Sequence, residues 1–337
     1  MSTNKLRLII VIVVLVMLSC SVFQPEQAST APKHILETNA EFEMLWSSSD
    51  LHLSYNNRRP NMVGAPGRII LLGSTSGDIP TGKLIGLDSL TGQTVWQSPG
   101  ASLGEIIADG ESLYFGTSGT ATLISYDVKN GEVLWSTRLP WAQSTSEIFL
   151  AENKIFIHTN DFQWFVIDED GGIIDSRSET NRTFLKIGDV LYMEDVYAIK
   201  AVDYSSQKEL WQLDLGASYT NSPIFDGDTI YLKTVGDTAF IYSINRHTGS
   251  VNWKMSEVVL SNLYLTGDKI YFINGDSRLT VLDKLSGNEI LNVKISPNLD
   301  LNEPNGSYFV SGDSTNKILA LYFGDNDQLV GLKIKSP

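Results

Sequence analysis

The sequence contains a single cysteine, fewer basic than acidic residues, and no apolar run long enough for a comfortable membrane span. Among its 337 residues, 25 are Lys or Arg and 39 are Asp or Glu, so the net charge is −14 at pH 7. An acidic surface repels phosphate backbones and anionic lipid head groups, and we therefore expect no nucleic-acid partner. The single cysteine excludes a disulfide within the chain, so the stability of the fold must come from packing.

That cysteine lies at the end of an export signal. Lys5 and Arg7 precede an apolar run, Leu8–Leu18, which is shorter than the ~20 residues of a transmembrane helix and typical of a signal peptide. The run ends in Ser19-Cys20, which resembles the lipobox of bacterial lipoproteins, where the cysteine is acylated and becomes the mature N-terminus. We expect a signal peptide over residues 1–19 and a lipid anchor at Cys20. An uncleaved signal anchor and simple secretion are the alternatives.

Residues 20–40 are rich in Pro, Ser, Ala and Gln and show no periodicity. This composition predicts a flexible tether that holds a folded domain, residues 41–337, away from a bacterial cell membrane. The folded domain would face the periplasm or the exterior.

One phrase recurs through the rest of the chain, as "GLDSLTGQTVW", "SYDVKNGEVLW", "AVDYSSQKELW" and "SINRHTGSVNW". Its Asp or Asn positions follow one another at about 40 residues, the period of four-stranded propeller blades. These positions are Asp88, Asp127, Asp168, Asp203, Asn245 and Asp283. The segments between turns are short and alternate in polarity, as in "KIFIH" and "TIYLK", which excludes helical repeats.

Each repeat is predicted to contain four strands, with a hairpin turn between the third and the fourth. The Asp or Asn at the end of the third strand can accept hydrogen bonds from backbone N–H groups of the turn. A glycine four residues later suits a turn that closes at positive φ. The glycines are Gly92, Gly131, Gly172, Gly249 and Gly287, and Gln207 is the exception. An Asp repeated in this way is expected to be structural and not catalytic.

The fourth strand carries a tryptophan at a fixed position in most repeats. The tryptophans are Trp96, Trp135, Trp211 and Trp253, and Ser176 and Leu291 take their place in the two other repeats. Because several copies occupy the same register, we expect the indoles to pack between neighbouring blades and not to stack on a ligand.

The two ends of the chain supply the parts of one further blade. Lys333 stands at the Asp position so close to the C-terminus that this repeat has no fourth strand, whereas Trp46 has no Asp-bearing turn before it. We expect the strand near residues 41–49 to complete the blade formed by residues 303–336, which removes two open sheet edges. The prediction is an all-β fold, a seven-bladed β-propeller of four-stranded antiparallel blades whose N-terminal strand closes the ring.

The phrase resembles the repeat of the pyrroloquinoline-quinone (PQQ) type β-propellers over nearly all of the chain after residue 40. That family includes quinoprotein dehydrogenases, which bind PQQ and Ca²⁺, and non-enzymatic relatives such as the propeller lipoprotein of the outer-membrane protein assembly machinery. The dehydrogenases use eight blades, longer chains and in many cases a vicinal cysteine pair, which this sequence lacks. The assembly lipoprotein is similar in its lipobox, tether and propeller, although it usually has eight blades. The resemblance implies the fold, and we expect no cofactor.

No constellation elsewhere in the sequence points to catalysis or to a metal site. The "DGD" at Asp226–Asp228 and the "GDND" at Gly324–Asp327 lack the full calcium-loop pattern and are interpreted as hairpin turns. The histidines are not spaced as metal ligands. They are His34, His52, His158 and His247. We expect no metal site and no catalytic residue, although the sequence leaves enzymatic activity open.

Loops at one end of the predicted propeller carry residues that interfaces favour. The longest loop, Ser47–Asn61, holds Arg58 and Arg59, an unusual pair in so acidic a chain, and Trp141 and Tyr219 fall in loops at the same end. Arg, Trp and Tyr are enriched in binding hot spots, so these four residues are predicted to form a binding patch. A solvated loop face with incidental aromatics is the alternative.

These features favour a monomeric, non-catalytic envelope lipoprotein whose propeller is a scaffold or binding module for another envelope protein or peptide. A carbohydrate- or small-ligand-binding propeller, with hydrolase or lyase activity as one form of it, is the first alternative. A PQQ-dependent dehydrogenase is the second. Converging carboxylates at the central channel would favour the first alternative, whereas a channel sealed by apolar side chains would favour the scaffold.

Overall fold

In the computed structural model residues 33–337 form one compact unit. The structure describes the following parts of this unit: 41–49, 51–53, 61–75, 82–98, 104–117, 119–143, 145–178, 182–195, 197–218, 223–235, 239–294, 308–324 and 328–335. The expected signal peptide, Cys20 and the tether lie outside these residues. Within the described ranges, no helix is long and apolar enough to cross a membrane.

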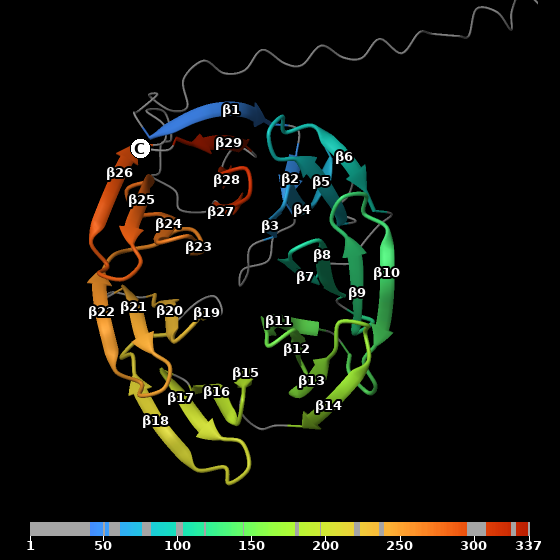
Figure 1. The fold of residues 1–337 in the computed structure, drawn as a ribbon, viewed down its shortest axis with the longest axis vertical. Coiled ribbons are helices and arrows are strands. Elements are labelled where there is room, and N and C mark those ends of the chain that lie inside the picture. The colour runs from blue at the N-terminus through green and yellow to red at the C-terminus, as the bar shows by residue number, and fades with distance from the viewer. Residues whose placement is uncertain are drawn as a thin grey trace, which may run out of the picture. The chain divides into compact units, whose positions relative to one another are not determined.

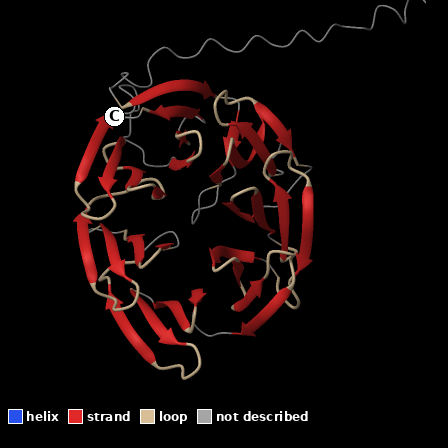
Figure 2. Ribbon diagram, in the orientation of Figure 1, coloured by secondary structure: helices blue, strands red, loops and turns tan. Residues whose placement is uncertain are grey.

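Seven antiparallel sheets form a ring, and each sheet is one blade (Figure 1; Figure 2). In blades 2 to 6 the chain runs from the innermost strand of a blade to its outermost strand and then enters the next blade. Blade 7 takes its outermost strand from the start of the chain, because β1 pairs with β29. The structure therefore confirms the predicted seven-bladed propeller and the way in which the ring is closed.

Blade 1 contains β2 (Leu51–Leu53), β3 (Met62–Ala65), β4 (Arg68–Thr75), β5 (Lys83–Asp88) and β6 (Thr94–Gln97). Blade 2 contains β7 (Gly104–Asp109), β8 (Ser112–Thr117), β9 (Thr122–Asp127) and β10 (Val133–Arg138). Blade 3 contains β11 (Thr145–Ala151), β12 (Lys154–Thr159), β13 (Gln163–Ile167) and β14 (Ile173–Ser178). Blade 4 contains β15 (Arg182–Ile187), β16 (Val190–Asp195), β17 (Ala198–Asp203) and β18 (Glu209–Asp214).

Blade 5 contains β19 (Ile224–Asp226), β20 (Thr229–Lys233), β21 (Phe240–Asn245) and β22 (Val251–Ser256). Blade 6 contains β23 (Tyr264–Thr266), β24 (Lys269–Ile273), β25 (Arg278–Asp283) and β26 (Glu289–Lys294). Blade 7 contains β27 (Tyr308–Asp313), β28 (Ile318–Phe323), β29 (Gln328–Ile334) and β1 (Phe42–Ser48).

The segment that was predicted as one loop, Ser47–Asn61, is partly strand. Ser47 and Ser48 belong to β1, and β2 pairs with the C-terminal half of β4, whereas β3 pairs with its N-terminal half. The innermost position of blade 1 is therefore shared by two short strands. The sequence did not reveal β2, because it is only three residues long.

The second and third strands of the blades are buried because neighbouring blades cover both of their faces. The stretch Ile155–His158 of β12 is buried throughout, and Phe156 packs in one cluster with Tyr192 of blade 4 and Leu232 of blade 5. The outermost strands instead alternate in exposure, as β10 does. The core thus consists of apolar layers between blades, and its energy comes from area removed from water on both faces of each sheet.

The seam between blades 7 and 1 is held by more than the pairing of β1. The Oδ2 atom of Asp313, which is fully buried, accepts hydrogen bonds from the Ser89 hydroxyl at 2.7 Å and from the Gly67 N–H at 2.9 Å. Gly64 and Gly312 approach each other so closely that a Cβ on Gly64 would overlap the Gly312 carbonyl. Paired β-strands, a buried carboxylate and close backbone packing together close the ring.

Candidate functional site

Five of the seven junctions between blades share one contact, which the tryptophan of the outermost strand makes. Its indole N–H donates to a main-chain carbonyl oxygen in the turn between the third and fourth strands of the next blade, at 2.8 to 3.1 Å. The pairs are Trp46 with Ser89, Trp96 with Val128, Trp135 with Glu169, Trp211 with Arg246, and Trp253 with Lys284. These tryptophans thus pack between blades and are not available to stack on a ligand.

Each of these indoles also covers a glycine in the same turn. A Cβ at that position would overlap the ring, and every one of the glycines has a positive φ. They are Gly92, Gly131, Gly171, Gly249 and Gly287. On the other side, the residue paired with the tryptophan within its own blade is small. These partners are Gly331, Gly86, Ser125, Ala201 and Ser243. We call this arrangement of indole, turn glycine and small partner the Trp–Gly contact.

Blade 3 departs from the predicted register by one residue. Its hairpin turn is shorter, so that Gly171 and not Gly172 takes the positive φ. The outermost strand is shifted by one residue as well. Val166 occupies the third-strand position that holds the small partner in the other blades, and it pairs with Asp175 instead of Ser176. Counting four residues from Asp168 misplaced both positions, because a turn can lose a residue while the strands keep their pairing.

The junction between blades 3 and 4 replaces the Trp–Gly contact with a polar one. The Tyr204 hydroxyl donates to Asp175 Oδ2 at 2.8 Å, and the Arg177 guanidinium lies 3.7 Å from the centre of the Tyr204 ring. Lys186 stacks on the same ring at 4.5 Å. The turn of blade 4 carries Gln207 at positive φ where the others have glycine. Loss of the tryptophan and loss of the glycine thus occur at the same junction.

The other junction without the contact lies between blades 6 and 7, where Leu291 pairs with Val281. The turn on which an indole would dock does not exist there, since the third and fourth strands of blade 7 come from opposite ends of the chain. At both exceptions the next blade therefore lacks the glycine turn on which an indole docks.

The Asp and Asn residues of the repeat are engaged in their own turns. In each, Oδ1 accepts a backbone N–H from a residue two to four positions later. Hydrogen bonds from Ser206 lower the pKa of Asp203, and those from Ser286 lower the pKa of Asp283. A general acid would need a raised pKa, so Asp203 and Asp283 are unsuited to acid catalysis at neutral pH.

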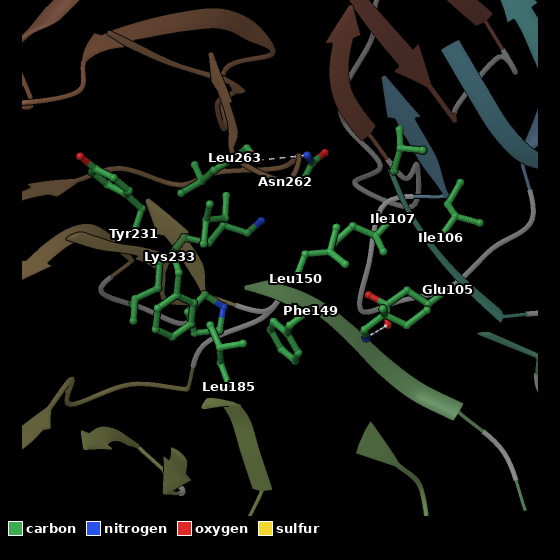
Figure 3. Close-up of a pocket in the computed structure, with 16 residues that line it drawn as sticks. Glu105, Ile106, Ile107, Phe149, Leu150, Leu185, Tyr231, Lys233, Asn262 and Leu263 are labelled. Atoms are coloured by element: carbon green, nitrogen blue, oxygen red, sulfur yellow. Dashed lines mark hydrogen bonds between the residues drawn. The ribbon is translucent and has the colours of Figure 1, made fainter. Parts of the chain in front are cut away.

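A cavity of about 270 Å³ lies where the inner parts of blades 1 to 6 meet. Its lining is mostly aliphatic and aromatic, with Ile107, Phe149, Leu150 and Leu185 among the side chains (Figure 3). The charged residues in the lining are Glu105 from β7 and Lys233 from β20, on opposite sides of the cavity in Figure 3. Within the described lining the cavity is thus apolar apart from one acidic and one basic side chain.

Both charged side chains are buried. The Lys233 ammonium donates to the carbonyl oxygens of Ser261 at 2.6 Å and Val259 at 3.1 Å, and burial lowers the pKa of Lys233 to about 8. Glu105 accepts the Ile148 N–H at Oε2, at 2.8 Å. Among the described residues no group of three His, Cys, Asp or Glu side chains could hold a metal ion.

The described part of the lining does not fit PQQ with calcium. PQQ carries three carboxylates, and its calcium ion would need several oxygen ligands at one place. The described wall offers one ammonium and one carboxylate on opposite sides. The cavity residues therefore give no basis for quinone chemistry.

The propeller has two ends that differ in character. The end that carries the connections between second and third strands and between successive blades is called here the loop face, and the opposite end, with the hairpin turns, the turn face. Trp141, which is 90% exposed, lies on the loop face between β10 and β11. Phe162, between β12 and β13, and Tyr197, between β16 and β17, are 55% and 54% exposed on the same face.

Trp141 and Phe162 lie at the same end of blade 3 because Thr145 pairs with Thr159 in the register of β11 and β12. Both aromatic residues have a φ of 59°, in the left-handed region. For a residue other than glycine this conformation costs ~1–2 kcal/mol. At Phe162 this conformation belongs to the short turn between second and third strands, because Ala121 and Ser277, the residues directly before β9 and β25, also have a positive φ, of 42° and 55°.

Of the four residues predicted to form the binding patch, the structure places one. Trp141 is on the loop face as expected, whereas Arg58, Arg59 and Tyr219 lie outside the described residues. The sequence reading missed Phe162 and Tyr197, and the available signal was an aromatic inside a short polar connection, as in "TNDFQ". It also missed Lys233, although a lysine that ends the apolar strand "TIYLK" is an unusual residue at a buried position.

Comparison with known proteins agrees with the fold. The sequence profile of the family described as outer membrane protein assembly factor BamB matches residues 80–186 and 185–323. Comparison with curated proteins finds no match.

Two solved structures illustrate the likeness of folds. BamB from Moraxella catarrhalis superposes with a TM-score of 0.51 at 15% identity, covering 88% of this chain and 99% of its own. The β-propeller domain of Cps50 (Swd1) from Myceliophteria thermophila gives a TM-score of 0.58 at 10% identity, covering 85% of this chain and 100% of its own. At such identities the superpositions support the propeller fold alone.

Proposed function

The chain belongs to the family described as outer membrane protein assembly factor BamB, and from this premise we propose that it is a non-catalytic lipoprotein scaffold that binds another protein of the bacterial envelope. The family description supports a partner in outer-membrane protein assembly. The propeller supplies a rigid platform, and the partner is bound by the loop face.

The observation that carries this proposal is the group of exposed aromatic side chains on that face. Three connections each supply one of them. Trp141 lies in the segment that joins blade 2 to blade 3, Phe162 in a connection of blade 3, and Tyr197 in a connection of blade 4. Large aromatic side chains left in water on one face of a monomer are typical of protein-interaction sites.

We further propose that residues 1–19 are removed as a signal peptide, that Cys20 carries the lipid and that residues 20–40 act as the tether. Arg58, Arg59 and Tyr219 belong in the same proposal as further members of the binding face, as predicted from the sequence. A membrane anchor would confine the loop face to the neighbourhood of envelope partners and raise their effective concentration.

The apolar lining of the central cavity favours a scaffold function and argues against a glycoside hydrolase or lyase. Hydrolysis of a glycosidic bond needs two carboxylates flanking the bond. The described lining provides Glu105 alone, and its Oε2 accepts the Ile148 N–H. The described lining contains no pair of converging carboxylates, which is the arrangement that would favour the carbohydrate alternative.

Copurification from native membranes tests the proposal. The double variant Trp141→Ser/Phe162→Ser should lose most of a bound envelope protein, since hot-spot aromatics dominate such interfaces. Leu285→Ser is the matched control, because Leu285 is 80% exposed on a hairpin turn of the turn face. Equal recovery of the partner by all three proteins would contradict the assignment of the loop face.

A further inference from the structure

The central cavity has the size and the walls of a small-molecule site. Its volume of about 270 Å³ exceeds the ~150 Å³ of an engineered apolar cavity that binds benzene. Leu150 of β11 and Ile107 of β7 form one wall of the cavity. Leu263, in the segment before β23, lies on the opposite wall (Figure 3). The described walls would therefore remove a hydrocarbon body of this size from water on several sides.

The ammonium of Lys233 has no counter-ion among the described residues. Its two hydrogen bonds go to neutral carbonyl oxygens, those of Val259 and Ser261, and burial is the cause of its altered pKa. An ammonium group has three N–H donors, so one donor has no acceptor among the described residues. Lys233 is 6% exposed, and a buried charge without a partner of opposite sign is energetically unfavourable.

We propose that this cavity binds a small amphiphilic monocarboxylate, with the carboxylate paired to Lys233 Nζ and the apolar body lying against the aliphatic wall. The inference is independent of the partner bound by the loop face. A charge-assisted hydrogen bond would supply the acceptor that the ammonium lacks. The apolar body would gain the transfer energy of its buried area.

Glu105 is the other charged residue in the described lining and lies on the opposite wall. An alcohol of the same chain length would fill the cavity without using the charge of Lys233.

Calorimetric titration of the full-length protein with decanoate tests this proposal. We expect saturable binding of one decanoate, weakened about 10- to 100-fold in Lys233→Met, the range that follows from losing one charged hydrogen bond. Binding of decanol should change little in the same variant. Lys269→Met serves as the control, since Lys269 lies in β24 outside the cavity lining.

Two further measurements keep the proposal falsifiable if Lys233→Met folds poorly. Ile107→Phe, which narrows the cavity from β7, should weaken decanoate and decanol together. Binding of decanoate at pH 8.5 should be accompanied by proton uptake, because pairing with a carboxylate raises the pKa of Lys233 from about 8. Absence of saturable decanoate binding, or equal affinity in wild type and Lys233→Met, would overturn the proposal.

Discussion

Trp46 donates its indole N–H to the carbonyl oxygen of Ser89 at 2.9 Å. The donor belongs to the strand that completes blade 7, and the acceptor belongs to the turn of blade 1. The same contact joins four other pairs of neighbouring blades. The seam at which the two ends of the chain meet is therefore built like an ordinary junction between blades, with an added carboxylate network at Asp313.

Trp46→Ala should destabilise the folded domain by about 3–5 kcal/mol, the range for deleting a buried aromatic side chain. The loss would include the hydrogen bond to Ser89 and the cover over Gly92. Urea unfolding measures it. Trp141→Ala is the control and should lie within about 0.5 kcal/mol of wild type, because that side chain is 90% exposed. Equal effects of the two substitutions would contradict a closing role for Trp46.

Two glycines of blade 2 separate backbone strain from steric overlap. Gly110 has a φ of 56° with open space at its Cβ position, whereas Gly131 has a φ of 72° and lies under the Trp96 ring. Gly110→Ala should cost about 1–2 kcal/mol from the left-handed backbone alone. Gly131→Ala should cost about 1–3 kcal/mol more, because the methyl group displaces the indole. Thermal unfolding of the two variants compares them directly, and identical costs would mean that the Trp–Gly contact has no steric requirement.

The junction between blades 3 and 4 depends on a polar pair. Tyr204→Phe removes the hydrogen bond to Asp175 and keeps the ring on which Arg177 and Lys186 stack. The coupling free energy between Tyr204 and Asp175 in a double-mutant cycle with Asp175→Ala should be about 0.5–1.5 kcal/mol. A coupling near zero would show that the two side chains act independently in solution.

The buried ammonium of Lys233 gives the protein a distinctive pH dependence. Burial lowers its pKa from 10.5 to about 8, so between these values the folded state loses the proton before the unfolded state does. Stability relative to Lys233→Met should therefore rise with pH across this interval, by up to about 3 kcal/mol. Below pH 8 the difference between the two proteins should be constant. A difference that stays flat from pH 7 to pH 10 would show that the ammonium is better solvated than the structure indicates.

Much of the fold could be predicted from the sequence because the repeat records its own geometry. The Asp turns, the glycines and the tryptophans recur in register, and Trp46 and Lys333 identify the blade made from both chain ends. What failed was local: in blade 3 the turn is one residue shorter, so counting placed Ser176 where Asp175 lies. Spacing along the chain cannot show which turn has lost a residue, since pairing across strands decides the register.

The candidate sites were harder to predict for a physical reason. Trp141 was recognisable because it stands outside the repeat, whereas Phe162 and Tyr197 sit in short connections that give no periodic signal. Lys233 and Glu105 come from blades 5 and 2, and only closure of the ring brings them to one cavity. Such a convergence depends on the whole tertiary structure and leaves no motif in the sequence.

The most direct test of the central claim is site-specific photocrosslinking in the native envelope, with the crosslinker placed at position 141 and, as the control, at position 285. Both residues are highly exposed, at 90% and 80%, and they lie on opposite ends of the propeller. A scaffold that binds through its loop face predicts a crosslinked envelope protein from position 141 and none from position 285. Capture of glycan alone, capture of nothing, or the same protein from both positions would contradict it.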